Sequence, residues 1–75
     1  MPKLPRVSGE RAIRALERMG FVRVRQSGSH VVLRKDTAEG AVGCVVPLHH
    51  ELAVGTLSGI LKLAKITPEK FLDNL

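Results

Sequence analysis

Three short extended segments in succession constrain the fold of this chain more than any other feature. Residues 21–26 alternate apolar and basic side chains with a period of two, which is typical of a half-buried strand. After the turn at Ser27 and Gly28, residues 29–35 make a second strand, and after a longer turn over 36–40, residues 41–46 make a third that Pro47 ends. Because strands joined by such short turns pair as neighbours, the sequence predicts a three-stranded antiparallel meander.

Amphipathic helices flank these strands. Residues 9–19 carry apolar side chains at helical spacing, with Ser8 as the N-cap and Gly20 placed to end the helix. A polar connector over 48–55 leads to a second predicted helix over 56–66, and Pro68 opens a short third helix that runs to residue 72. Gly59 inside the second helix costs about 1 kcal/mol relative to alanine, so we expect close packing or a backbone contact there. The order is α-β-β-β-α plus a short C-terminal helix, an α+β fold with both main helices on one face of the sheet.

The length of the chain limits it to one thin hydrophobic core. With 75 residues we expect a single domain over residues 1–75 and only a shallow active site. Its one cysteine, Cys44, excludes an intramolecular disulfide and a cysteine-rich zinc module, and we expect it in the core. No apolar run is long enough to cross a bilayer, so we expect a cytoplasmic protein that binds no membrane.

Packing helices on one face of the sheet assigns each strand an inner and an outer set of side chains. The most apolar sets are expected inside: Val22, Val24, Val31, Leu33, Val42, Cys44 and Val46. The alternate sets are expected on the open face: Phe21, Arg23, Arg25, His30, Val32, Arg34, Ala41, Gly43 and Val45. A single β-bulge would reverse the assignment within its strand.

The positive charge is concentrated in the first third of the chain. Twelve Lys and Arg against seven Asp and Glu give a net charge of +5, and residues 1–25 alone hold seven of the bases and two of the acids. Six of those seven bases are arginine, whose planar guanidinium matches phosphate bidentately. The sequence therefore predicts a polyanionic partner, although a basic face can also serve solubility alone. Three of the arginines form a stripe on the outer side of the first helix: Arg11, Arg14 and Arg18.

His30 is the strongest candidate for chemistry. It follows a glycine-containing turn at the start of a strand, beside arginines and away from the aliphatic set. RNA carries its own nucleophile, the 2′-OH next to the scissile phosphate, so one imidazole base and a few cations can constitute a minimal ribonuclease without metal or cofactor. The plainer alternative is a polar surface histidine.

Other residues give weaker signals. His49, His50 and Glu51 lack the spacing of a zinc site, whereas an accessory role in catalysis is open to His49 because Pro47 fixes the chain before it. Thr56 either caps its helix or helps to offer backbone N–H groups to a phosphate. The chain has no Trp or Tyr for base stacking and no Walker, Rossmann or nucleophile-elbow pattern, which excludes stacking single-strand binders, nucleotide-driven enzymes and acyl transferases.

Three motifs in this order resemble the HicA family of toxins from type II toxin–antitoxin pairs. They are the run over residues 20–30 that ends in Gly28-Ser29-His30, the Pro47-Leu48-His49 step, and Gly55-Thr56-Leu57 with Ile60-Leu61-Lys62. The resemblance covers nearly the full length and implies a fold like that of double-stranded RNA-binding domains. It also implies an mRNA interferase, an endoribonuclease held inactive by a HicB-type antitoxin, with His30 as the catalytic base. The His50-Glu51 pair departs from the glycines or small residues of many members, which puts the geometry of that loop in doubt.

Several interpretations follow for the basic residues. We expect Arg23, Arg25, Ser29 and Arg34 to contact the scissile phosphate. The stripe of Arg11, Arg14 and Arg18 points away from the sheet, and either binds flanking RNA or meets an acidic antitoxin surface. Two other functions compete with an endoribonuclease: a non-catalytic nucleic-acid-binding module, and a protein-interaction domain whose basic stripe serves only an acidic partner.

Overall fold

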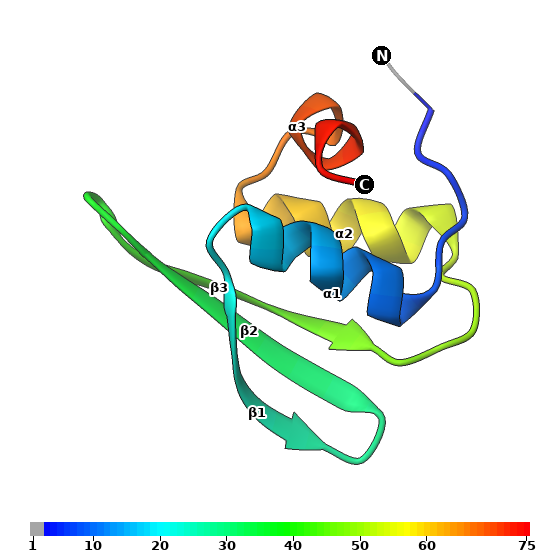
Figure 1. Ribbon diagram of the computed structural model, residues 1–75, viewed down its shortest axis with the longest axis horizontal. Helices are drawn as coiled ribbons and strands as arrows, with labels where there is room; N and C mark the ends of the chain where they lie inside the picture. The colour runs from blue at the N-terminus through cyan, green and yellow to red at the C-terminus, as the bar shows by residue number, and fades with distance from the viewer. Residues whose placement is uncertain (1–2) are drawn as a thin grey trace.

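A computed structural model describes residues 3–75 as two layers, with two helices packed on one face of a three-stranded sheet (Figure 1). The elements in chain order are α1 (Gly9–Arg18), β1 (Val22–Ser27), β2 (His30–Thr37), β3 (Gly40–Pro47), α2 (Val54–Ala64) and α3 (Pro68–Asp73). The strands pair antiparallel in the order β1-β2-β3. This arrangement confirms the predicted α+β fold and meander. None of the helices within residues 3–75 is long and apolar enough to span a membrane.

Local side-chain chemistry sets most of the helix ends. The Ser8 hydroxyl accepts a hydrogen bond from the backbone N–H of Arg11 at 3.1 Å, and Thr67 does the same for Lys70 at 3.2 Å, so α1 and α3 begin as predicted. Gly20 has a φ of +99° and ends the α1 segment.

The second main helix differs from the prediction at both ends. It begins at Val54 rather than Thr56, with Ala53 as an N-cap that makes no side-chain hydrogen bond, and it ends at Ala64 because Lys65 adopts the left-handed conformation. Gly59 is exposed, and a Cβ atom there would meet nothing within 4 Å, so the expected close packing at Gly59 is wrong.

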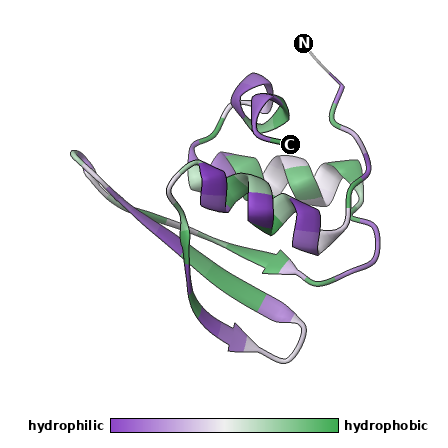
Figure 2. Cartoon of the chain, viewed as in Figure 1, coloured by the Kyte–Doolittle hydropathy of each residue, from purple (hydrophilic) through white to green (hydrophobic). Residues whose placement is uncertain are grey.

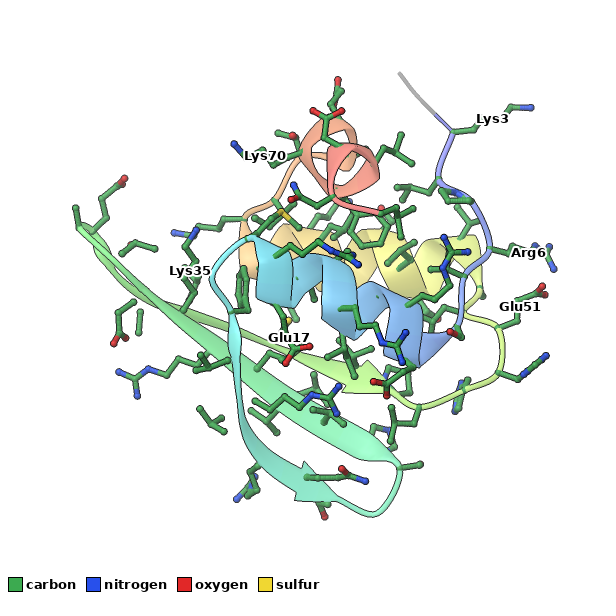
Figure 3. The ribbon with its side chains drawn as sticks, in the orientation of Figure 1. Lys3, Arg6, Glu17, Lys35, Glu51 and Lys70 are labelled. Carbon is green, nitrogen blue, oxygen red and sulfur yellow. The ribbon has the colours of Figure 1, made fainter. Side chains whose placement is uncertain are left out.

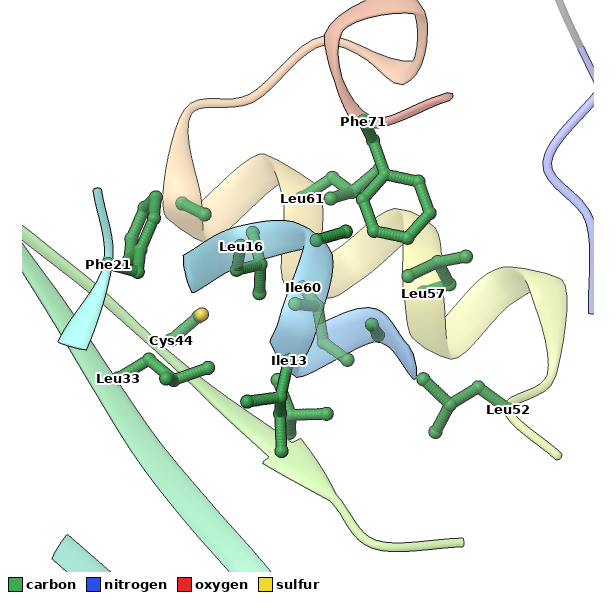
Figure 4. Packing of buried hydrophobic residues seen from close by; sticks show 14 of the residues in the cluster. Ile13, Leu16, Phe21, Leu33, Cys44, Leu52, Leu57, Ile60, Leu61 and Phe71 are labelled. Carbon is green, nitrogen blue, oxygen red and sulfur yellow. The ribbon is translucent and has the colours of Figure 1, made fainter. Parts of the chain in front are cut away.

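The core lies between the helices and the inner face of the sheet (Figure 4). The largest fully buried side chains come from the three helices, from β2 and β3, and from the connector before α2: Phe71, Ile13, Leu16, Leu33, Leu52, Leu57, Leu61, Val31 and Val46. Each contributes about 1.5–3 kcal/mol through burial. Cys44 lies in this core as predicted, 4% exposed. Its burial raises the pKa of the thiol to about 11.

The register of β1 contains the main correction to the predicted faces. β2 and β3 pair regularly from His30–Pro47 to Thr37–Gly40, but the β1–β2 register shifts between Arg23 and Arg25, which leaves Val24 in a bulge. Val22 and Val24 are therefore 58% and 52% exposed instead of buried. Arg23 lies opposite Leu33, on the helix side instead of the open face.

Phe21 is the second correction on this side of the sheet. It was expected on the open face, yet only 2% of it is exposed. It precedes the strand, and its backbone N–H donates to the carbonyl of Leu16 at 3.1 Å, so the ring is packed beneath the end of α1 (Figure 4). Its position is set by the helix end rather than by strand alternation.

Candidate active site on the open face of the sheet

His30 is the first residue of β2 and follows a two-residue turn directly. Ser27 and His30 form the last residue pair of the β1–β2 hairpin before the turn. Gly28 in the turn has a φ of +57°, a left-handed conformation that residues with a Cβ atom adopt less readily than glycine. The amide of Gln26 donates to the carbonyl of Gly28 at 3.0 Å and holds the turn. Because Val31 and Leu33 are buried against the helices, His30 faces the other way and is exposed, as predicted.

The open face around His30 combines an apolar floor with cations. Val32 lies opposite Val45 of β3 and Arg25 of β1, so these three side chains share the face with His30. Val45 is 44% exposed. Within residues 3–75 Arg25 makes no ion pair, whereas Arg34 pairs with Asp36 at 3.1 Å, and both side chains of that pair are more than half exposed.

Arg23 is removed from this group by the bulge. Its guanidinium donates to Glu10 at 2.7 Å and to Glu17 at 3.4 Å, both carboxylates of α1 (Glu17 is labelled in Figure 3). The hydrogen bond to Glu10 is the main reason that the pKa of Arg23 is raised. Arg23 thus ties β1 to α1, while Arg25, two positions on, stays free on the open face.

A second segment is held beside His30. Pro47, the last residue of β3, lies opposite His30, and the N–H of Leu48 donates to the carbonyl of Ser29 at 2.6 Å. The first residue of α1, Gly9, donates its N–H to the carbonyl of His49 at 3.0 Å. The Gly-Ser-His and Pro-Leu-His segments, seventeen or more residues apart in sequence, therefore lie side by side.

Gly9 is the supporting residue that sequence reasoning missed. It is buried, and a Cβ atom there would overlap the carbonyl oxygen of Pro47 and approach the Cα of Leu48 to 3.1 Å. The available signal was a glycine at the first position of a helix that already has a serine N-cap. A glycine at such a position indicates that the backbone of another segment lies too close for a side chain, here the backbone of Pro47 and Leu48 beside Gly9.

The remaining candidates lie apart from His30's face. Glu51 pairs with Arg6 at 3.4 Å (Figure 3), and no three His, Cys, Asp or Glu side chains of residues 3–75 gather as a metal site. Thr56 lies inside the first turn of α2 and does not cap it. A hollow near the tip of the β2–β3 hairpin, against Lys35 and Lys65, is lined by none of the predicted site residues.

The arginine stripe forms a separate basic surface on α1, the purple outer face of that helix in Figure 2. Its side chains line one small hollow together with Leu75: Arg11, Arg14 and Arg18. Arg18 is oriented by the backbone carbonyl of Asn74, to which it donates at 2.8 Å. Arg14 lies 3.8 Å from the Glu10 carboxylate oxygen that also accepts the shorter, 2.7 Å hydrogen bond from Arg23.

These observations define a small two-layer α+β domain that presents a histidine and two arginines on an open sheet face. The family model described as the HicA toxin of bacterial toxin–antitoxin pairs matches residues 9–66, from the start of α1 to just beyond α2. The chain belongs to this family, and it is accordingly the toxin of a toxin–antitoxin pair with an antitoxin as its partner. A search of curated proteins found no match.

Proposed function

We propose that this toxin is a metal-independent endoribonuclease that cleaves mRNA, with His30 as the general base. The imidazole removes the proton of the 2′-OH next to the scissile phosphate, and the resulting oxygen attacks phosphorus. The observation that carries the proposal is the position of His30: exposed at the head of β2, with Arg25 unpaired on the same face of a toxin of the HicA family.

Phosphate binding in this proposal rests on three neighbours of His30. Arg25 has no ion pair to break within residues 3–75, so it can grip a phosphate directly. The exposed Arg34–Asp36 pair is worth at most about 1 kcal/mol, so a phosphate can compete for Arg34. Ser29, in the turn itself, adds a hydroxyl. Arg23 serves the fold through Glu10 and Glu17 rather than this contact.

The antitoxin, in this proposal of the HicB type, contacts the stripe of arginines on α1. Both glutamates of α1 bond Arg23, so within residues 3–75 Arg14 keeps only a 3.8 Å ion pair with Glu10, and Arg11 and Arg18 have none. The helix separates the stripe from the open sheet face, where the RNA is cut, so the two basic surfaces serve different ligands. Carboxylates of a protein partner match guanidinium groups that stand beside the apolar Leu75.

The test incubates the purified full chain with end-labelled mRNA, with and without EDTA. Wild type is expected to cut in both conditions, and His30→Ala to lose at least about 100-fold in rate. His50→Ala is the matched control, because it removes a neighbouring exposed histidine. Intact RNA with wild type, or equal cleavage by His30→Ala, contradicts the proposal. Salt-sensitive binding without any product would instead indicate a non-catalytic RNA-binding module.

A further inference from the structure

We propose that His49 is the general acid of this site, the group that protonates the 5′-oxygen as it leaves phosphorus. The inference rests on the proposed ribonuclease function and adds the residue that completes it. With base catalysis by His30 alone, the 5′-oxygen would have to leave as an unprotonated alkoxide, which is a poor leaving group. A proton donor on the other side of the phosphate would therefore speed the reaction.

The sheet places His49 on the same side as His30. Pro47 lies directly opposite His30, and the hydrogen bond from Leu48 N–H to the Ser29 carbonyl continues the pairing one residue beyond β3. Leu48, held in this pairing, packs partly against the core and His49 is exposed, so we infer that the side chain of His49 turns to the open face. Diagonal neighbours of this kind in a sheet lie roughly 7–8 Å apart. Two hydrogen bonds of about 2.8 Å with a phosphate between them require a gap of this order.

The backbone that carries His49 is fixed from several directions. Gly9 N–H donates to the His49 carbonyl at 3.0 Å, and the absence of a side chain at Gly9 lets α1 approach the carbonyl of Pro47. At the other end of the connector, Leu52 N–H donates to the carbonyl of Val7 at 2.7 Å. This segment outside regular secondary structure is therefore held by backbone hydrogen bonds on both sides of His50, and a positioned proton donor needs such a fixed backbone.

The side chain of His49 is available for this role. It is exposed and makes no hydrogen bond within residues 3–75, whereas Glu51, the nearest acid in the connector, is engaged by Arg6. Imidazole can hold and release a proton near neutral pH. The adjacent His50 is also exposed but lies in a bend beyond the paired residues, which makes it the natural control.

The reaction balances with these two histidines alone. His30 takes the proton of the 2′-OH, the 2′-oxygen bonds to phosphorus, the bond from phosphorus to the 5′-oxygen breaks, and protonated His49 gives its proton to that oxygen. The products are a 2′,3′-cyclic phosphate and a 5′-hydroxyl. Proton exchange with water returns both imidazoles to their starting states.

An RNA oligonucleotide with sulfur in place of the bridging 5′-oxygen tests the role directly, because a thiolate leaves without being protonated. On ordinary RNA, His49→Ala is expected to cleave at least about 100-fold more slowly than wild type. On the sulfur-containing RNA it is expected to approach the wild-type rate, while His30→Ala stays impaired on both substrates. His50→Ala should match wild type throughout, and His49→Gln should repeat the His49→Ala pattern with the side-chain volume largely kept.

Each other outcome decides the question. Wild-type rates for His49→Ala on ordinary RNA would overturn the assignment and leave the ribonuclease proposal standing. An equal loss on both substrates, in a variant whose thermal unfolding matches wild type, would show a binding or structural role instead. Failure of wild type to cut either RNA would overturn the ribonuclease proposal, and the acid with it.

Discussion

Alanine at Gly9 and alanine at Gly59 should change stability in opposite directions, although both are glycine-to-alanine changes within a helix. At Gly9 the added Cβ would overlap the backbone carbonyl of Pro47. Overpacking of this kind costs about 1–3 kcal/mol, and displacement of the connector weakens the 3.0 Å hydrogen bond to His49, worth about another 0.5–1.5 kcal/mol. We expect Gly9→Ala to lose about 2–4 kcal/mol in the free energy of unfolding.

At Gly59 the same atom enters open space. The helix then gains the propensity of alanine, about 1 kcal/mol, which raises the melting temperature by roughly 4–8 °C in a domain of this size. Urea denaturation of both variants beside wild type, followed by circular dichroism, measures the two differences. If Gly9→Ala is as stable as wild type, the close approach of α1 to the Pro47 carbonyl is not a constraint, and the reasoning about the connector fails with it.

Three further predictions concern other side chains. Arg23→Ala should destabilise the fold by about 0.5–2 kcal/mol, measured by urea denaturation, because it removes two exposed ion pairs to α1; an unchanged midpoint would contradict this. The pKa of the buried Cys44 thiol is higher in the folded chain than in the unfolded chain. The free energy of unfolding should therefore fall as the pH rises from about 9 to about 11, and the Cys44→Ala variant should lack this part of the pH dependence. Replacing all three arginines of the stripe by glutamine should weaken antitoxin binding at least tenfold, measured by calorimetry, without slowing RNA cleavage. Slower cleavage with intact antitoxin binding would assign the stripe to RNA instead. The variant carries Arg11, Arg14 and Arg18→Gln, and the charge-matched control carries Lys62, Lys65 and Lys70→Gln.

Features with a local cause could be read from the sequence. Ser8 and Thr67 cap their helices through hydrogen bonds that span three residues, and the turn before His30 follows from one glycine. The start of α2 was predicted two residues late because Ala53 caps it without any side-chain signal.

Features with a distant cause could not be read in this way. The bulge at Val24 and the burial of Phe21 depend on how β1 meets α1, a tertiary contact that period-two alternation does not contain. The exposed position of His30 was predicted correctly. Its neighbour His49 stands out only once the hydrogen bonds that join Gly9 and Ser29 to the connector are known.

The bulge in β1 also gives different roles to Arg23 and Arg25, whose side chains would lie on the same face of a regular strand. If Val24 were paired regularly, Arg23 and Arg25 would share one face of the sheet. Because Val24 lies in a bulge, Arg23 holds the strand to α1 and Arg25 is left for a ligand on the opposite face. The same irregularity disturbs the free edge of β1, which makes that edge a poor template for another strand and so guards a small, apolar sheet against self-association. Removing Val24 would make the pairing regular and leave Arg23 opposite Leu33 and Arg25 opposite Val32, whereas pairing Val24 regularly would put both arginines on one face and undo the separation of their roles.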